Sequence, residues 1–377
     1  MNYSTGNIED IFKYLHSHPE LSYQESNTTS YIKGIMEREG IDVVDIPLET
    51  GLVAEINGTL PGRGITVGMR ADIDALPIEE QSGLPYASGN KGVMHACGHD
   101  IHTSIAIETA RILNLNKENF SGRVRIIFQA AEESGFGARD ALNANALGDS
   151  DAVFSLHSSP ILPAGGLGIK SGAITSSVDI FKITLTGVGT HAAMPQNGVD
   201  PIVAAAALIS SLQSVVSRST SPYDKVVVSV THIEGGNSWN VIPDSVLLEG
   251  TVRTMGNDVR ERIVRRIYEI VNGTAEAYGV KAHIDWRQGP PATDNDAELA
   301  KFAFDEAEKS GFDVVDGYET MVGEDFATIQ EKYRGLMIWV GTGVGAPLHS
   351  PEFKADYSVI EPTAKYFSEL IIKYLNR

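Results

Sequence analysis

The chain has 377 residues, more than one hydrophobic core usually organises, so we expect two domains. Its 49 acidic and 30 basic residues give a formal net charge of -19, which disfavours nucleic acid and anionic membrane surfaces as partners. The single cysteine, Cys97, excludes an internal disulfide and favours a reducing compartment. Residues 1–10 lack the regions of a secretory signal, and the longest apolar run, Ile202–Ile209, is too short to span a membrane. We therefore expect a cytoplasmic protein.

The first part of the chain alternates short apolar strands with helices. Two helices open it, at Ile8–Ser17 and Ser26–Glu39. The strands expected next are Leu52–Ile56, Ile65–Arg70, Val124–Gln129 and Ala152–His157. The helices expected at Ile101–Leu113 and Glu133–Ala146 lie between these strands in the sequence, as the crossover helices of a largely parallel sheet do. This order predicts an α/β domain.

From about Val178 the pattern becomes β-α-β-β-α-β, the order of a ferredoxin-like sandwich. Its elements are Asp179–Thr186, Pro201–Val216, Lys225–Ile233, Val246–Thr254, Asp258–Tyr278 and Lys281–Trp286. A helix at Ala297–Lys309, a strand at Leu336–Val340 and a helix at Tyr357–Tyr374 follow. We therefore predict a catalytic domain of residues 1–177 and 290–377, interrupted by an inserted α+β domain, 178–289, that serves as a lid or dimerisation unit.

The segment His95-Ala-Cys-Gly-His-Asp-Ile-His102 places five ligand-type side chains within eight residues. Cys97 and His99 are two apart, so both can face one site if Gly98 lets the chain bend. Asp100 is expected to cap the following helix and hold the loop rigidly. The alternative is an ordinary capping loop with scattered histidines.

A second segment, Gln129-Ala-Ala-Glu-Glu133, ends an apolar strand with two adjacent carboxylates. Adjacent side chains diverge, so one glutamate can bind a metal while the other takes a proton from water. A solvated acidic start to the next helix is the alternative.

Three further groups lie at predicted strand ends. His157 ends one strand and His349 follows another, where open α/β sheets bind ligands, although a single histidine there is more often structural. Asp72 and Asp74 share one face of a strand end, so either can orient a ligating histidine. An ordinary turn before Pro77 explains the pair of aspartates equally well.

Taken together, these motifs resemble the amidohydrolase branch of the dinuclear metallopeptidases, which includes aminoacylases, hippurate hydrolases and auxin-conjugate hydrolases. The resemblance runs nearly end to end. It rests on His18-Pro-Glu-Leu21, Arg70-Ala-Asp-Ile-Asp-Ala-Leu-Pro77, Met94–Thr103, Gln129–Glu133, Gly189-Thr-His-Ala-Ala-Met-Pro195 and Leu348-His-Ser-Pro351. It implies a phosphorylase/hydrolase-like catalytic domain.

The resemblance also implies a set of roles. Two divalent ions per subunit, drawn from Zn, Mn, Ni and Co, are expected on Cys97, His99, Glu133, His157 and His349. A cysteine in place of the bridging aspartate of related carboxypeptidases favours zinc, nickel or cobalt over manganese.

Asp72 is expected, from its place at a strand end, to support the catalytic site. Further roles come from the resemblance, which implies that Glu132 is the general base. His191 is expected near the substrate carbonyl, and Asn240 near the substrate carboxylate. A homodimer, or a tetramer built from dimers, is expected to form through the inserted domain.

The function expected from these residues is hydrolysis of the amide bond of an N-acyl-L-amino acid. A second possibility on the same scaffold is an N-acetyl-diaminopimelate deacetylase. A third makes Cys97 a covalent nucleophile, and a fourth is a non-catalytic metalloprotein that binds an amino acid. The adjacent Glu132 and Glu133 argue against the last, because structural metals need no spare base.

Overall fold

The computed structural model describes residues 7–377, so residues 1–6 of the segment considered for a secretory signal lie outside the described residues. Contacts divide the chain into two compact units. The first unit comprises residues up to Ile174 together with Asp294–Tyr318 and Asp325–Arg377, and the second comprises Thr175–Thr293 together with Glu319–Glu324.

The boundaries differ from the expected ones at three short segments. Residues 175–177, 290–293 and 319–324, expected in the catalytic domain, belong to the second unit. For residues 319–324 the reason is local pairing, because the N–H and hydroxyl of Ser176 donate to the carbonyls of Val322 and Met321. The role of the second unit as a lid or dimerisation domain stays a prediction.

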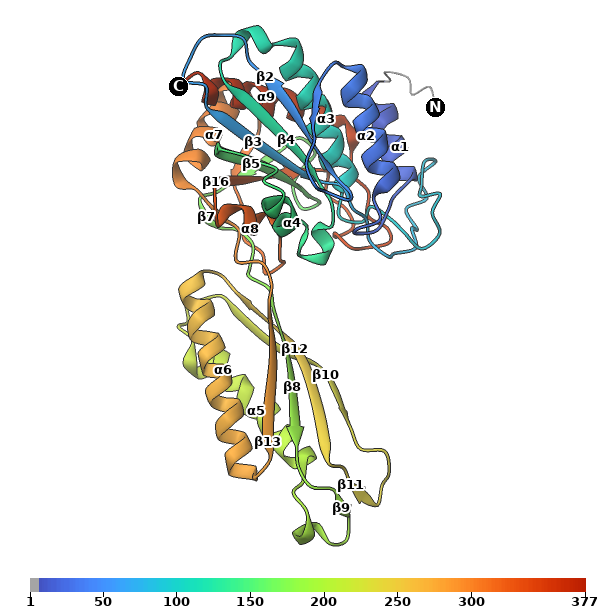
Figure 1. Ribbon diagram of the computed structural model, residues 1–377, viewed down its shortest axis with the longest axis vertical. Helices are drawn as coiled ribbons and strands as arrows, with labels where there is room; N and C mark the ends of the chain where they lie inside the picture. Colours follow the sequence, from blue (N-terminus) through green and yellow to red (C-terminus); the bar gives the residue numbers. More distant parts are fainter. Residues whose placement is uncertain (1–6) are drawn as a thin grey trace. The chain divides into compact units, whose positions relative to one another are not determined.

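An eight-stranded sheet organises the first unit, in the order β1-β2-β4-β3-β5-β16-β6-β15 (Figure 1). The central strands β4, β3, β5 and β16 run parallel, and β1, β2 and β6 pair antiparallel at the flanks. The strand bounds are β1 Asp42–Val44, β2 Leu52–Asn57, β3 Thr66–Asp72, β4 Arg123–Gln129, β5 Ser150–Ser159, β6 Leu167–Ile169, β15 Val314–Asp316 and β16 Arg334–Gly341. The predicted α/β fold with a mostly parallel sheet is confirmed.

Helices cover both faces of this sheet, so its strands are apolar on both sides. In β4, Ile126 packs with the larger helical layer, whereas the next residue, Ile127, packs into the core on the other face. The larger layer consists of α1 Ile8–Ser17, α2 Ser26–Arg38, α3 His99–Leu115, α7 Ala297–Lys309 and α9 Ile360–Leu375. The other face is covered by α4 Gly137–Asn143 and α8 Phe326–Gln330. The small strands β7 Gly172–Ala173 and β14 Asp294–Asn295 pair separately.

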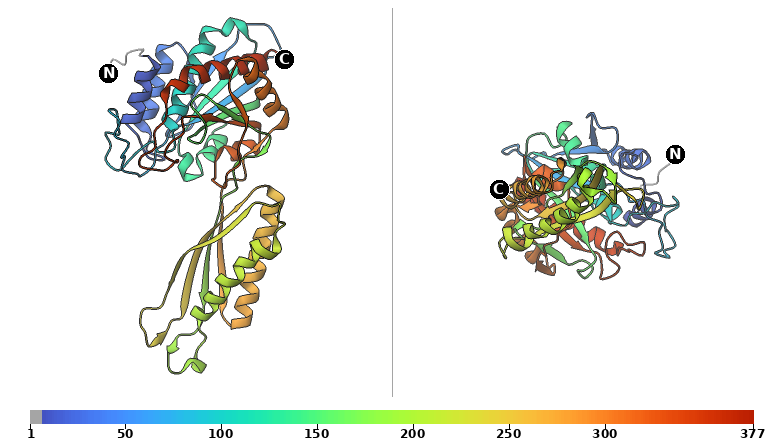
Figure 2. Two further views of the ribbon diagram at one scale, coloured as in Figure 1. Left: turned by 180° about the vertical axis from the view of Figure 1, so that it is seen from behind. Right: turned by 90° about the horizontal axis from the view of Figure 1, so that it is seen from below.

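The second unit is an antiparallel sheet, β10-β12-β8-β13, with two helices side by side on one face (Figure 2). The bounds are β8 Asp179–Thr186, β9 Thr190–His191, α5 Pro201–Ser219, β10 Val226–Gly235, β11 Val241–Ile242, β12 Ser245–Thr254, α6 Asn257–Tyr278 and β13 Lys281–Gln288. The order of elements and strands is ferredoxin-like.

Helix α5 is long and apolar enough to cross a membrane by length and composition. One of its faces, which includes Ala204, Leu208 and Leu212, is buried in the core between the helices and the sheet. Only 28% of the apolar stretch is buried in the structure, and Ile202 and Val203 are exposed, so packing within the unit covers one face of α5.

Two local expectations were wrong. The helix expected at Glu133–Ala146 is split into a short 3₁₀ turn, Glu132–Ser134, and α4, because Gly135 adopts a left-handed conformation between them. Asp100 does not cap α3: the helix begins at His99 after Gly98, whose φ is 83°, and Asp100 lies in the first turn. The left-handed glycine ends the loop two residues earlier than the sequence pattern indicated.

Candidate metal centre

Six side chains with metal-ligand chemistry converge at the carboxyl ends of the strands in the first unit. They form three overlapping groups whose ligand atoms lie within 4.8 Å of one another: Cys97 with His99 and His157, Cys97 with Glu133 and His349, and His99 with Glu132 and Glu133. Cys97, His99 and Glu133 each belong to two of these groups. The six side chains therefore form one connected cluster of donors.

The distances fit tetrahedral coordination. Metal–ligand bonds of about 2.3 Å to sulfur and about 2.0–2.1 Å to nitrogen or oxygen put tetrahedral S and N donors about 3.6 Å apart, and N and O donors about 3.4 Å apart. Cys97 Sγ lies 3.6 Å from His157 Nε2, and Glu133 Oε1 lies 3.3 Å from His349 Nε2. These two pairs therefore have the spacing of donors that bind the same divalent ion.

The ring nitrogens point to the same conclusion. His157 Nδ1 lies 3.0 Å from the carbonyl of Ser158, to which it can donate, and this leaves Nε2 as a lone-pair donor toward Cys97. Within residues 7–377, neither nitrogen of the fully buried His99 makes a well-oriented hydrogen bond, and neither does Glu133 Oε1. Buried polar atoms without a well-oriented hydrogen bond are rare, and a group of them directed at one another is suited to hold a cation.

His102 is not available as a ligand, although it lies near Asp72 and His99. Its Nδ1 is 2.5 Å from Asp72 Oδ1, and its Nε2 accepts the N–H of Ser158 at 2.7 Å. Both nitrogens are thus used, and burial lowers the pKa of His102 to about 4. His102 therefore links Asp72 to the backbone beside His157, a role that the motif alone did not distinguish from ligation.

Asp72 and Asp74 support the centre from the end of β3. Asp72 Oδ2 lies 3.6 Å from His99 Nε2, and Asp74 Oδ1 lies 3.3 Å from His99 Nδ1. Asp74 also accepts the backbone N–H groups of Glu132 and Glu133. The pair therefore orients both a histidine and the turn that carries the two glutamates.

A buried arginine lies beneath these aspartates. Arg70 is fully buried and donates to Asp72 Oδ2 at 2.9 Å, to Asp325 Oδ1 at 2.6 Å and to Gln129 Oε1 at 3.0 Å. Burial alone would raise the pKa of Asp72, but the charges of His99, Arg70 and His102 hold it well below its ordinary value. Asp72 is therefore an anion at neutral pH.

His16, at the end of α1, anchors the start of α3. Its Nδ1 lies 2.6 Å from Asp100 Oδ2 and its Nε2 lies 3.2 Å from Glu80 Oε1. Burial would lower the pKa of His16, but the two carboxylates raise it to about 10. The charged cluster fixes Asp100 beside His99, and neither His16 nor Glu80 carried a sequence signal.

The groups around two of the proposed ligands raise the pKa values of their imidazole rings. Hydrogen bonding to Cys97 and Glu133 raises the pKa of His349 to about 10. Burial opposes the charge of His99, yet the neighbouring Asp72 and Cys97 raise its pKa well above the ordinary value. His349 also has a φ of 62°, an uncommon conformation for a non-glycine residue that occurs often at functional sites.

The remaining predicted residues lie in other places. His191 and Asn240 belong to the second unit, where the carbonyl of Asn240 accepts the N–H of Ala192 and His191 pairs with Val241. They are therefore neighbours, and their roles toward a substrate stay predictions. His95 is buried and, within residues 7–377, belongs to none of the donor groups; burial lowers its pKa to about 4.

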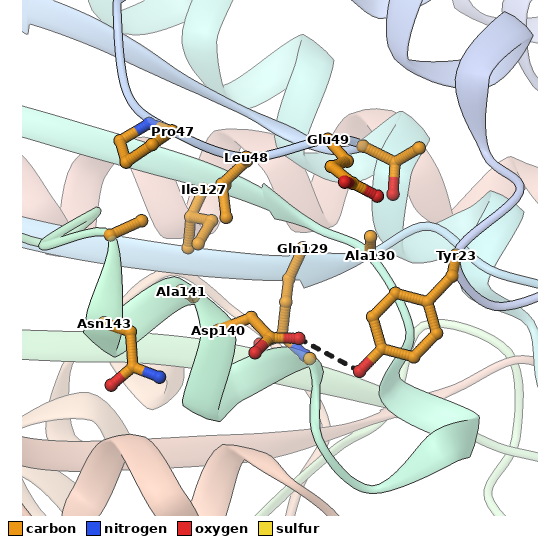
Figure 3. A pocket seen from close by; sticks show the side chains of 13 residues that line it. Tyr23, Pro47, Leu48, Glu49, Ile127, Gln129, Ala130, Asp140, Ala141 and Asn143 are labelled. Carbon is orange, nitrogen blue, oxygen red and sulfur yellow. Dashed lines mark hydrogen bonds between the residues drawn. The ribbon is translucent and has the colours of Figure 1, made fainter.

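A cavity of about 390 Å³ lies beside the end of β4 (Figure 3). Its apolar lining includes Leu48, Ile127 and Ala141, and the hydroxyl of Tyr23 donates to Asp140 across it. Ala130, next to the turn that carries the glutamates, also lines it.

This fold and this donor set define a metal-dependent hydrolase with a dinuclear centre. The model of Peptidase family M20/M25/M40 matches residues 68–373, and the chain belongs to this family. It is a hydrolase of the family's amidohydrolase branch.

Three relatives illustrate the similarity. The chain is 44% identical to the N-acetylcysteine deacetylase of Bacillus subtilis over 95% of this chain and 94% of the relative. It is 35% identical to the N-acetyldiaminopimelate deacetylase of the same organism, over 97% and 98%. The crystal structure of the B. subtilis YxeP protein, described as a dinuclear metal-binding peptidase of the M20 family, superposes with a TM-score of 0.89 at 40% identity and covers 98% of both chains.

Proposed function

We propose that the protein hydrolyses the amide bond of N-acyl-L-amino acids, with a short acyl group such as acetyl, and releases the free amino acid. The observation that carries this proposal is Glu132, a carboxylate beside the predicted ligand Glu133 and within 4.8 Å of His99. A spare carboxylate next to a donor set has the position of a general base. The similarity to N-acetylcysteine deacetylase supports the acyl-amino acid substrate.

The ion-binding residues proposed are Cys97, His99, Glu133, His157 and His349. Two bound divalent ions would supply the Lewis acidity that makes water a nucleophile at neutral pH and polarises the amide carbonyl. The thiolate favours zinc, nickel or cobalt over manganese.

Glu132 moves the proton in this proposal. It accepts a proton from the attacking water, whose oxygen bonds to the carbonyl carbon, and delivers that proton to the nitrogen as the C–N bond breaks. Its Oε1 accepts the N–H of Asp325 at 3.3 Å, which helps to hold the carboxylate in place. Asp72 acts through His99 and His102.

The second unit is proposed to provide substrate contacts. His191 donates to the oxygen on which negative charge develops, and Asn240 binds the substrate carboxylate. The unit is also proposed to form the interface of a homodimer. Action in the cytoplasm is part of the same proposal.

N-acetyl-diaminopimelate hydrolysis is the second candidate. A relative of this activity covers nearly the whole chain, but its identity is lower, 35% against 44%. The order of these identities favours a simple N-acyl-amino acid.

The proposal is tested by release of free amino acid from N-acetyl, N-benzoyl and N-acetyl-diaminopimelate substrates. Each is assayed before chelation, after chelation, and with zinc, manganese, cobalt or nickel restored. Release that depends on metal and is fastest for N-acetyl-L-amino acids supports the proposal. Preference for N-acetyl-diaminopimelate would favour the second candidate, and the absence of release with every metal would refute both.

A further inference from the structure

The backbone that carries the two glutamates is held by carboxylates from two other segments. After β4 the chain turns at Ala131, whose φ of 58° is left-handed. The N–H of Ala131 donates to Glu25 Oε1 at 2.8 Å, and those of Glu132 and Glu133 donate to Asp74 at 3.1 and 3.0 Å. Three consecutive N–H groups thus each donate to a carboxylate.

Glu25 has no capping role that would explain this contact. It precedes the first residue of α2, but its side chain makes no capping hydrogen bond. Glu20 performs that task, because its carboxylate accepts the N–H and hydroxyl of Thr28 at 2.8 and 2.9 Å. The side chain of Glu25 instead reaches, from a fully buried position, to a residue 106 positions later in the chain.

The contact is costly to keep. Within residues 7–377 the second oxygen of Glu25 is buried and makes no well-oriented hydrogen bond. Burial raises the pKa of Glu25, and contacts with Thr50 and the N–H of Ala131 only partly oppose this. Alanine also disfavours the left-handed conformation that the turn requires. A buried carboxylate with one unsatisfied oxygen, directed at a strained residue next to the predicted base, indicates that the turn geometry matters.

The same loop reaches the turn at a second point. Ser22 donates to Asp74 Oδ2 at 2.6 Å, the oxygen that also accepts the N–H of Glu133. The loop between α1 and α2 therefore supports both carboxylates that bind the turn.

We propose that Glu25 is a positioning residue for Glu132: by accepting the N–H of Ala131 it holds the left-handed turn that directs the Glu132 carboxylate toward the reacting water. This inference rests on the proposed role of Glu132 as base. Glu25 itself touches neither substrate nor ion in this account.

The test compares Glu25→Ala, Glu25→Gln and the control Glu20→Ala in metal-loaded enzyme. Glutamine keeps the acceptor oxygen, so Glu25→Gln retains most activity. Glu25→Ala lowers kcat by about 10- to 100-fold, because small misplacements of a catalytic group cost about this much. KM changes by less than about threefold and both ions stay bound, because the substrate and ion contacts are untouched. Glu20→Ala lowers the thermal midpoint and leaves kcat unchanged.

A double variant separates positioning from folding. Glycine takes the left-handed conformation without strain. Adding Ala131→Gly to the Glu25→Ala variant therefore raises its kcat about fivefold. Glu25→Ala that lowers only the thermal midpoint, or that releases an ion, would overturn the inference.

A crystal structure of Glu25→Ala tests the inference without any substrate. Ala131 is expected to leave the left-handed region, with loss of the hydrogen bond from Glu132 to Asp74. An unchanged turn would overturn the inference even if the wild-type enzyme had no activity on N-acyl amino acids. The absence of wild-type activity would refute the proposed function alone.

Discussion

Removal of the buried cation Arg70 provides the most quantitative test of how the fold supports the centre. Arg70 and its two carboxylate partners, Asp72 and Asp325, are all fully buried. Arg70→Met fills the volume but leaves both carboxylates without their cation. Removing one partner of a buried ion pair lowers the free energy of unfolding by about 3–5 kcal/mol. We expect a loss within that range, because Asp325 still accepts hydrogen bonds from the N–H of Ala138 and the side-chain amide of Gln129.

The loss depends on pH. In the wild type the pKa of Asp72 lies below its ordinary value, so this group stabilises the fold above that value and the contribution is lost as pH falls through the folded-state pKa. Without Arg70, the pKa of Asp72 is higher than in the wild type, although the charge of His99 still lowers it. The difference in stability between the two proteins is therefore full at neutral pH and becomes smaller as pH falls through and below the ordinary pKa of an aspartate.

The assay is urea unfolding of metal-free protein, followed by the fluorescence of Trp339. This residue lies in β16 of the first unit and is 3% exposed, so Trp239 and Trp286 of the second unit are replaced by phenylalanine in all proteins. The expected loss lowers the midpoint by about 1 M urea.

Arg334→Met is the matched control. Arg334 also contacts two carboxylates, Asp296 and Glu298, but its side chain is 41% exposed, so its removal costs less than about 1 kcal/mol. Equal losses for the two variants, or a loss at Arg70 that grows as pH falls, would refute the reasoning.

Three further predictions concern the centre itself. Because the pKa of His349 is about 10 without metal, metal binding between pH 6 and 9 releases protons, and the metal affinity rises with pH. Calorimetry in buffers of different ionisation enthalpy measures the number of protons released. Metal binding without proton release would contradict this prediction. Glu132→Gln keeps both ions by elemental analysis but lowers kcat about 10²- to 10⁴-fold; a fully active variant excludes the base role. Peroxide releases metal and abolishes activity through oxidation of Cys97, whereas unchanged metal content after oxidation of that thiol would count against its ligand role.

Much of the fold was predictable because local signals and global packing agree. The bounds of α1, α7 and β8 match the expected ones residue for residue. Asn7 accepts the N–H of Glu9 at the start of α1, and Asp296 caps α7 in the same way. The long helix expected from Glu133 does not form, because Gly135 adopts a left-handed conformation that the helical sequence pattern does not reveal.

The residue types of the centre indicated its chemistry, but the sequence did not show which of these residues contact one another. The sequence singled out the donors because each stands in a short motif at a strand end. The motif by itself did not separate His99, whose ring nitrogens lack well-oriented hydrogen bonds within residues 7–377, from His102, whose two nitrogens are both used; only the family resemblance named His99. Such a choice depends on partners brought close only by folding.

The supporting residues were missed for the same reason. Asp325 lies 255 residues from Arg70, and Glu25 lies 106 residues from Ala131. No spacing rule links residues so far apart. Only the folded sheet places them together.

The most direct test of the central claim is titration of metal-free enzyme with zinc while the release of free amino acid from N-acetyl-L-cysteine and N-acetyl-L-alanine is followed. We expect no release without metal, and a rate of release that reaches a plateau at two zinc ions per subunit. Undiminished release after complete removal of metal would contradict it.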